Sequence, residues 1–303
     1  MLTEIKAPFI TKISDPAMEE KGLELNLLRL DDVHPEISGN KWFKLKYNIE
    51  AFQRSGSGIL VSCGGPWSNH IAALAAAAYH SQIPAAALIR GEEHIPLNPT
   101  LHKAREYGMK LAYVNRTVYR DKIVLEQKAR DLFGTDLFWI PEGGSNAWGV
   151  LGCTEILSRM TLNPDVICCA SGTGATVAGM AASNKGRNKL LAFPVLKGGG
   201  FIRDNIEAFS GSPIAAEVKF MNDYHFGGYG KVSPELIRFV DEFYTRHRIW
   251  LDYIYTGKMM FGIYDLAARG FFERGTCILA IHTGGVQGNA GTAINRGLFE
   301  IDP

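Results

Sequence analysis

The chain has 303 residues, of which 46% are apolar and 21% charged, and its formal net charge is +1. This length allows about two domains or one large α/β unit, and the composition is that of a compact globular protein. The balanced charge offers no field for nucleic acid or for an anionic membrane. We therefore expect a small molecule as the partner.

The termini and the cysteines indicate a compartment. The N-terminal sequence has no cationic segment followed by an apolar stretch, and no run reaches the ~18 apolar residues that cross a bilayer. The five cysteines are odd in number, and Cys168 and Cys169 lie side by side in an apolar run. This pattern is typical of reduced, buried thiols. We expect a cytoplasmic protein with no membrane partner and no metal site.

Short apolar or β-branched runs alternate with helical patterns along the chain. Strands are predicted at 58–63, 85–90, 110–114, 136–140, 165–170, 189–195 and 277–282. Helical stretches such as 69–80 and 98–108 lie between the first four runs. Because alternating βα units form parallel sheets, the fold class is α/β, with two domains whose parallel-rich open sheets are flanked by helices. We place a small α/β domain at 46–150, inserted into a larger cofactor-binding domain made of 1–45 plus 151–303.

Two polar segments in the first half of the chain open predicted helices. In residues 39–45, Gly39 and Asn40 form a turn, and Lys41 and Lys44 follow on one helical face. Such lysines are usually solvated surface charges when considered alone. In the second segment Ser68, Asn69 and His70 begin an alanine-rich helix. Serine or asparagine at this position is preferred as an N-cap, and that role does not exclude a ligand.

A glycine-rich loop between a predicted strand and a predicted helix has the features of a phosphate site. Free amides at a helix N-terminus, glycines that permit close approach and hydroxyls together bind phosphate. The loop lacks the lysine of a nucleotide-binding P-loop, and its glycines at 172, 174 and 179 do not match a dinucleotide fingerprint. A cofactor phosphate is therefore favoured over a nucleotide. The loop consists of Ser171, Gly172, Thr173, Gly174, Ala175 and Thr176.

The C-terminal third places polar residues at the ends of predicted elements, where parallel α/β sheets gather their ligands. These residues are Tyr255, Thr256, His282 and Thr283. We expect His282 to be a packed, hydrogen-bonded residue with no role as an acid or base.

In combination, these motifs resemble the 1-aminocyclopropane-1-carboxylate deaminase and D-cysteine desulfhydrase family. The resemblance covers nearly the whole chain, and the order of the motifs is more specific than any one of them. Its anchors are G-N-K-x-x-K-L at 39–45, S-N-H at 68–70, G-G-S-N at 143–146, the loop at 171–176, Y-T-G-K at 255–258 and H-T-G-G at 282–285. The resemblance implies the tryptophan-synthase-β-like (fold type II) fold and pyridoxal 5'-phosphate as cofactor. We also expect a homodimer.

The resemblance also implies roles for single residues. Lys41 corresponds to the lysine that forms a Schiff base with the cofactor, and Lys44 is similar to the lysine near its phosphate. Asn69 matches the residue that bonds the phenolic oxygen, and Ser68 matches the serine near the carboxylate and reacting carbons of the substrate. The two active-site tyrosines of the family match Tyr229 and Tyr255.

Some positions separate the two branches of this family. Thr256 stands where the deaminases usually carry a glutamate facing the pyridine nitrogen, and Thr283 stands where they carry leucine. Both threonines resemble the desulfhydrase branch, in which a neutral hydroxyl leaves the ring a weaker electron sink. Trp67 and the pair Ile71 and Ala72 depart from both branches.

We therefore expect β-elimination from a small amino acid such as D-cysteine, with Lys41 taking the Cα proton and pyruvate and ammonia as products. The alternative on the same scaffold is cyclopropane ring opening by a deaminase. A nucleotide-dependent oxidoreductase is disfavoured by the glycine spacing. A binding protein without catalysis is disfavoured by the presence of Lys41.

Overall fold

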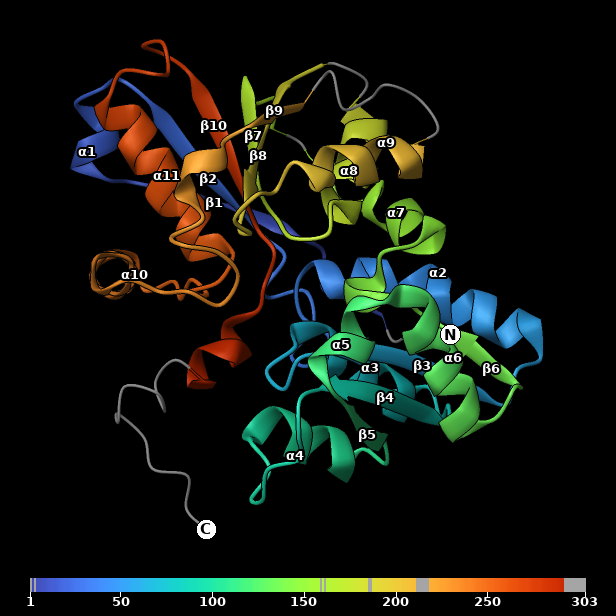
Figure 1. Ribbon diagram of the computed structural model, residues 1–303. Coiled ribbons are helices and arrows are strands. Elements are labelled where there is room, and N and C mark those ends of the chain that lie inside the picture. Colours follow the sequence, from blue (N-terminus) through green and yellow to red (C-terminus); the bar gives the residue numbers. More distant parts are fainter. Residues whose placement is uncertain are drawn as a thin grey trace.

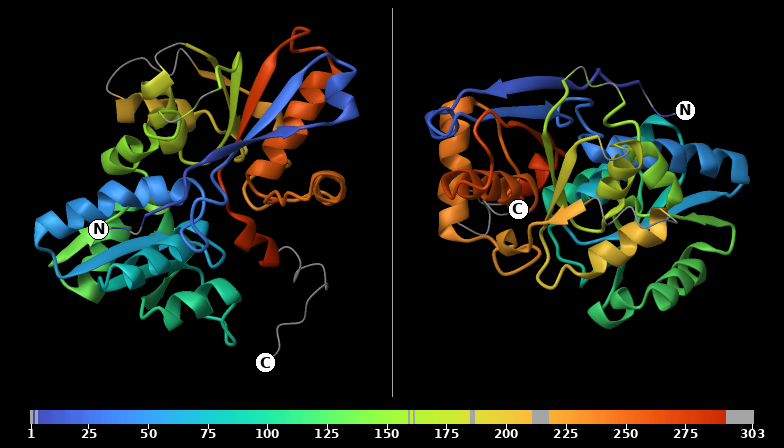
Figure 2. Two further views of the ribbon diagram at one scale, coloured as in Figure 1. Left: turned by 180° about the vertical axis from the view of Figure 1, so that it is seen from behind. Right: turned by 90° about the horizontal axis from the view of Figure 1, so that it is seen from above.

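The computed structural model describes residues 2, 4–158, 160, 162–184, 187–210 and 218–291. Within these ranges the strands form two sheets, each with helices on its faces (Figures 1 and 2). Among the described residues, no helix combines the length and hydropathy needed to cross a bilayer.

The larger sheet has the strand order β1-β2-β10-β7-β8-β9 among the described residues. Only the pairing of β1 with β2 is antiparallel, and the other pairings of this sheet are parallel. Its strands are β1 (Phe9–Ile13), β2 (Glu24–Arg29), β7 (Val166–Ser171), β8 (Lys189–Pro194), β9 (Val218–Phe220) and β10 (Cys277–His282).

The smaller sheet has the order β5-β4-β3-β6, and its described pairings are all parallel. Its strands come from one stretch of the chain. They are β3 (Ile59–Gly64), β4 (Ala85–Arg90), β5 (Lys110–Val114) and β6 (Leu137–Trp139).

Two helices, α2 and α7, lie between the sheets and pack on each other (Figure 1). The largest apolar cluster includes Leu60 and Ala87 of the smaller sheet and Ile167 and Leu279 of the larger one. A continuous core therefore joins the two halves. The helices are α1 (Pro16–Glu19), α2 (Asn40–Ser55), α3 (Asn69–His80), α4 (Pro99–Glu106), α5 (Arg116–Arg120), α6 (Lys122–Phe133), α7 (Ala147–Cys153), α8 (Ala175–Asn184), α9 (Phe201–Ser210), α10 (Pro234–His247) and α11 (Thr256–Ala268).

The α/β fold class is confirmed, and each strand predicted from the sequence is present within one or two residues. Three further strands, β1, β2 and β9, were missed. The pairing of β2 with β10 joins residues about 250 positions apart, so no local pattern announces it. The domain boundaries at 45 and 150 stay a prediction. All five cysteines are free; four are buried and Cys277 is half-buried.

Candidate active site

The start of α2 is held against the end of β10, which places Lys41 at the carboxyl edge of the larger sheet. Gly39 has φ +68°, and a Cβ there would lie 1.9 Å from the Thr283 carbonyl oxygen. Only glycine permits this approach. The Asn40 amide donates to the same carbonyl at 3.2 Å. Residues 39–41 and 283 are therefore neighbours despite their distance in sequence.

Lys41 and Lys44 bring two amines into a buried environment. The Lys41 Nζ donates to Asn40 Oδ1 at 2.8 Å, and Asn40 Nδ2 donates to the Thr176 hydroxyl at 2.8 Å. Lys44 is 3% exposed, and its Nζ donates to the Gly143 carbonyl at 3.1 Å. Burial, with the charge of Lys44 beside it, lowers the pKa of Lys41 to about 7, and burial lowers that of Lys44. Lys41 is therefore an amine that is largely neutral and nucleophilic just above neutral pH.

The loop between β7 and α8 has the geometry expected for an anion site. Gly174 has φ +95°, which turns the chain into the first turn of α8, where the leading amides have no acceptor within the helix. The Ser171 hydroxyl is buried and has no hydrogen-bond partner in the described chain. Ser145 donates its hydroxyl hydrogen to Thr173, and Asn205 Nδ2 donates to the Thr173 carbonyl at 3.1 Å. The loop is thus fixed from outside while one buried hydroxyl stays unpaired.

Ser68 and Asn69 begin α3 at the edge of the smaller sheet. Ser68 is the N-cap, and its hydroxyl accepts from the Ile71 amide at 3.3 Å. Asn69 Oδ1 accepts from Gln287 Nε2 at 2.6 Å, and Gln287 Oε1 accepts from the Thr100 hydroxyl at 2.8 Å. Gln287, which the sequence did not single out, therefore bridges the two halves of the molecule. It also leaves the Asn69 amide nitrogen as a donor on the other side.

His70 is a buried histidine whose tautomer follows from its partners. The Ser62 hydroxyl donates to the Ile140 carbonyl at 2.7 Å, so its lone pair accepts from His70 Nε2 at 2.8 Å. Nδ1 is then an unprotonated acceptor, buried and without a partner among the described residues. Burial and the nearby charges of Lys41 and Lys44 lower the pKa of His70 well below its ordinary value. This neutral ring lies beside two lysines without adding a third positive charge.

Tyr229 and Tyr255 form an edge-to-face pair with ring centroids 6.1 Å apart. A Cβ on Gly172 would lie 3.1 Å from Tyr255, so the Tyr255 ring packs directly over the glycine loop. Burial and the adjacent Tyr229 raise the pKa of Tyr255 well above its ordinary value. Tyr255 is therefore a neutral phenol that keeps its proton.

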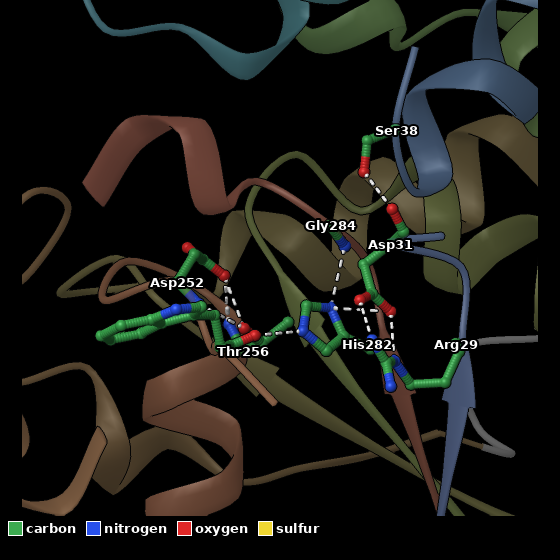
Figure 3. Close-up of polar contacts among 8 residues, drawn as sticks. Arg29, Asp31, Ser38, Asp252, Thr256, His282 and Gly284 are labelled. Carbon is green, nitrogen blue, oxygen red and sulfur yellow. Dashed lines mark hydrogen bonds and ion pairs between the residues drawn. The ribbon is translucent and has the colours of Figure 1, made fainter. Parts of the chain in front are cut away.

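The two threonines differ sharply in their surroundings. The Thr256 hydroxyl donates to Asp252 Oδ1 at 2.7 Å and accepts from the Asp252 amide at 2.9 Å (Figure 3). Its only hydrogen is committed within the protein. Thr283 is 7% exposed, and its hydroxyl has no hydrogen-bond partner among the described residues. Of the two, Thr283 alone has a hydroxyl hydrogen to offer a ligand.

His282 supports the turn after β10 and does not face solvent. Its Nε2 donates to the Trp250 carbonyl at 2.7 Å, and its Nδ1 accepts from the Gly284 amide at 3.2 Å (Figure 3). The ring is fully buried. The prediction of a packed, hydrogen-bonded histidine is confirmed.

The sequence motifs thus converge at the carboxyl ends of parallel strands from both sheets. The family profile described as pyridoxal-phosphate dependent enzyme matches residues 10–284. The chain belongs to this family of pyridoxal-phosphate dependent enzymes. Its cofactor is pyridoxal 5'-phosphate.

Individual relatives narrow the group. A Pyrococcus horikoshii protein provisionally named 1-aminocyclopropane-1-carboxylate deaminase is 31% identical over 89% of this chain and 86% of its own length. A Thermotoga maritima protein with the same provisional name is 28% identical over 89% of this chain and 91% of its own. The crystal structure of a homologue of this deaminase superposes with a TM-score of 0.82, at 25% identity, over 95% of this chain and 93% of the other.

More distant structures share the fold. A hydrogen sulfide-producing enzyme from Fusobacterium nucleatum has a TM-score of 0.70 at 15% identity, over 93% of this chain and 96% of the other. The chain is therefore a fold type II pyridoxal-phosphate enzyme of the group that contains the deaminases and their relatives.

The residues of the site fit this cofactor. The aldehyde of the cofactor reacts with a neutral amine, and the lowered pKa of Lys41 makes its amine neutral just above neutral pH. A phosphate requires donors, and the loop offers the unpaired Ser171 hydroxyl together with the leading amides of α8.

Proposed function

We propose that the protein is a lyase that eliminates the β-substituent from a small amino acid, with D-cysteine or a related β-substituted D-amino acid as substrate. The net reaction consumes one water: the amino acid gives the released substituent with its proton, a 2-oxo acid and ammonia. For D-cysteine the products are hydrogen sulfide, pyruvate and ammonia.

The observation that carries this proposal is the contrast between Thr256 and Thr283. A neutral hydroxyl beside the pyridine nitrogen favours elimination of a good leaving group over ring opening, because the ring is then a weaker electron sink. Thr283 has the free hydroxyl hydrogen, whereas that of Thr256 is bound to Asp252. We therefore assign the pyridine nitrogen to Thr283, with Thr256 beside it as a support.

The geometry of the site supports the following proposals for the remaining cofactor contacts. Lys41 would carry the covalent link, and the loop from Ser171 to Thr176 would bind the phosphate, with Lys44 nearby as a cation. Asn69, whose Oδ1 already accepts from Gln287, would offer its amide N–H to the phenolic oxygen. When bound, the cofactor withdraws electrons from the substrate and makes the Cα–H bond more acidic.

The protein groups then move protons. Lys41, as a free amine, would be a base with a pKa of about 7, close to the ideal for accepting the Cα proton at Nζ. Tyr255, over the glycine loop, and Tyr229 beside it keep their phenolic hydrogens and would donate hydrogen bonds to the departing substituent. Ser68 lies at the N-terminus of α3, where a substrate carboxylate is stabilised by free amides.

A second candidate is 1-aminocyclopropane-1-carboxylate deaminase, which opens the ring to give 2-oxobutanoate and ammonia with one water consumed. The provisional names of the Pyrococcus and Thermotoga relatives favour it. The threonines at 256 and 283 favour elimination instead.

An amino-acid panel read as release of 2-oxo acid distinguishes the two. The substrates are D-cysteine, L-cysteine, β-chloro-D-alanine and 1-aminocyclopropane-1-carboxylate, compared as kcat/KM, with the Lys41→Ala variant as the blank. We expect D-cysteine or β-chloro-D-alanine to exceed the cyclopropane by at least about 10-fold, the discrimination of ~1.4 kcal/mol. Efficient ring opening without turnover of D-cysteine would show that the protein is a deaminase of the cyclopropane amino acid and not a β-eliminating lyase.

Two further expectations belong to this proposal. We propose that the enzyme acts in the cytoplasm and as a homodimer. Light scattering during gel filtration should give twice the chain mass of 33.3 kDa.

A further inference from the structure

Lys258 is a fully buried lysine that none of the contacts assigned above uses. It lies in the first turn of α11, three residues after Tyr255, and its exposed fraction is zero. Among the described residues no carboxylate lies within ion-pair distance of its Nζ. An ammonium in this place is disfavoured twice, because burial penalises the charge and because the N-terminal end of a helix carries partial positive charge. Burial lowers the pKa of Lys258 to about 8.

What compensates the ammonium is a pair of carbonyls from a distant loop. Lys258 Nζ donates to the His225 carbonyl and to the Gly228 carbonyl, each at 2.9 Å. These carbonyls also accept from the loop's own amides, His225 from Gly228 at 3.0 Å and Gly228 from Lys231 at 3.2 Å. The loop is therefore folded around the lysine amine.

The loop is also held by the Gly227 amide, which donates to His225 Nδ1 at 3.0 Å, and by the Phe226 ring, which packs edge-to-face on Phe261, but its backbone is unusual. Phe226, Gly227, Gly228 and Gly230 all have positive φ, at +53°, +88°, +124° and +73°. This conformation is costly for Phe226 and entropically unfavourable for the glycines. Tyr229 sits in the middle of this run, is 47% exposed, and makes its edge-to-face contact with Tyr255.

We propose that Lys258 is a positioning residue for Tyr229: its buried amine holds the carbonyls of His225 and Gly228 and thereby fixes the Tyr229 ring against Tyr255. One turn of α11 then sets both tyrosines, Tyr255 through the backbone and Tyr229 through the lysine. Asp252 contributes to the same turn, because its carboxylate accepts from the amides of Ile254, Tyr255 and Thr256. The effect on turnover rests on the proposed function, in which Tyr229 contacts the substrate, whereas the effect on the loop does not.

The first test measures the loop itself by hydrogen–deuterium exchange of the cofactor-loaded protein. Lys258→Met keeps the length and apolar body of the side chain and removes the donors. We expect amides of 225–231 to exchange at least about 5-fold faster, and Lys258→Arg, which keeps the donors, to restore most of the protection. Met259→Ala is the matched control, since Met259 is the next residue, is fully buried and has no hydrogen-bond donor in its side chain. Unchanged exchange in Lys258→Met, or an equal rise in Met259→Ala, would overturn the proposal.

The second test is a double-mutant cycle on kcat/KM with the best substrate of the panel. We expect Lys258→Met to lower kcat/KM about 10-fold when Tyr229 is present and less than about 2-fold in the Tyr229→Ala background. Equal losses in both backgrounds would show that Lys258 does not act through Tyr229. If Tyr229→Ala leaves turnover unchanged, the proposed role of Tyr229 fails, and the exchange experiment still decides whether Lys258 holds the loop. Should Lys258→Met not fold, Lys258→Leu, which also lacks hydrogen-bond donors, replaces it in both tests with the same expectations.

Discussion

Two clusters of buried polar groups, at the starts of α2 and α11, are built in opposite ways. At the start of α11, Asp252 accepts from three backbone amides and from the Thr256 hydroxyl. Figure 3 shows the contacts between Asp252 and Thr256. At the start of α2, Lys41 and Lys44 bury two amines together, beside a His70 nitrogen that has no partner in the described chain. The first cluster is complete without a ligand, and the second is not. The polar groups at the start of α11 therefore stabilise the fold, whereas those at the start of α2 are available to a ligand.

Removing the centre of the complete cluster should cost the most stability. Asp252→Ala leaves the first amides of α11 and the Thr256 hydroxyl without an acceptor in a buried place, so we expect a loss of about 3 kcal/mol in the free energy of unfolding. Asp121→Ala is the control, because Asp121 caps α6 in the same way on the surface, and it should cost about 1 kcal/mol. Urea denaturation measures both. Equal losses would mean that the α11 cluster is no more than an ordinary cap.

The glycine loop should respond in cofactor affinity more than in stability. Gly174→Val puts a side chain at φ +95° and within 3.3 Å of the Ile202 carbonyl, which displaces the loop amides. We expect at least a 100-fold loss of affinity for pyridoxal phosphate, equivalent to ~2.7 kcal/mol. Gly134→Val is the control, since Gly134 has φ +91° and open space around it. Both variants should lose similar stability, and full cofactor occupancy of Gly174→Val at micromolar concentration would refute the loop assignment.

The incomplete cluster should become more stable when its charge is removed. Lys41→Met should raise the free energy of unfolding of the cofactor-free protein by on the order of 2 kcal/mol near pH 6. The pKa of Lys41 is about 7 in the fold and ~10.4 when unfolded. Between about pH 7 and about pH 10 the unfolded chain therefore binds more protons than the folded protein does. The wild type therefore gains stability as the pH rises from about 7 to about 10, and the advantage of the variant shrinks.

A lysine on the same helix gives the opposite sign. Lys46 is paired with Glu155 at 2.7 Å, so Lys46→Met should lose a few tenths of a kcal/mol. Denaturation of both variants at about pH 6 and about pH 9 checks the account. An advantage of Lys41→Met that grows with pH would contradict it.

The two threonines give the smallest and most selective contrast. Thr256→Val should lose about 1–2 kcal/mol of stability, because Asp252 loses a donor, and leave the absorbance of the bound cofactor nearly unchanged. Thr283→Val should cost less than about 0.5 kcal/mol and shift that absorbance, because its hydroxyl faces the ligand in our assignment. If instead Thr256→Val shifts the absorbance and Thr283→Val does not, Thr256 is the residue that contacts the pyridine nitrogen.

The sequence predicts the parts of this protein that local patterns encode. Alternating apolar runs located the strands from 58 to 282, and Gly39 and Gly174 marked turns that need positive φ. The antiparallel β1 and the pairing of β2 with β10 depend on contacts between distant segments, so they were not visible. For the same reason the sequence motifs did not distinguish Thr256 from Thr283. Only the structure shows that the hydroxyl hydrogen of Thr256 is bound to Asp252.

Gln287 and Lys258 illustrate the same limit within the site. The contacts of these residues do not follow from sequence spacing, since Gln287 bridges Asn69 and Thr100, and Lys258 reaches carbonyls some 30 residues upstream. The Y-T-G-K motif contains Lys258, but only the structure shows that this side chain is buried. A residue that positions a segment distant in sequence can be recognised only in the folded structure.

The most direct test of the incomplete cluster is the covalent link itself. Pyridoxal phosphate is added to cofactor-free protein at several pH values, the product is reduced with borohydride, and the modified peptide is identified by mass spectrometry. We predict one pyridoxyl adduct, on Lys41, with a rate of attachment that rises through a midpoint near pH 7 as the amine loses its proton. An adduct on Lys44 or Lys258, or attachment to Lys41 only above about pH 9 as for an ordinary lysine, would contradict the account.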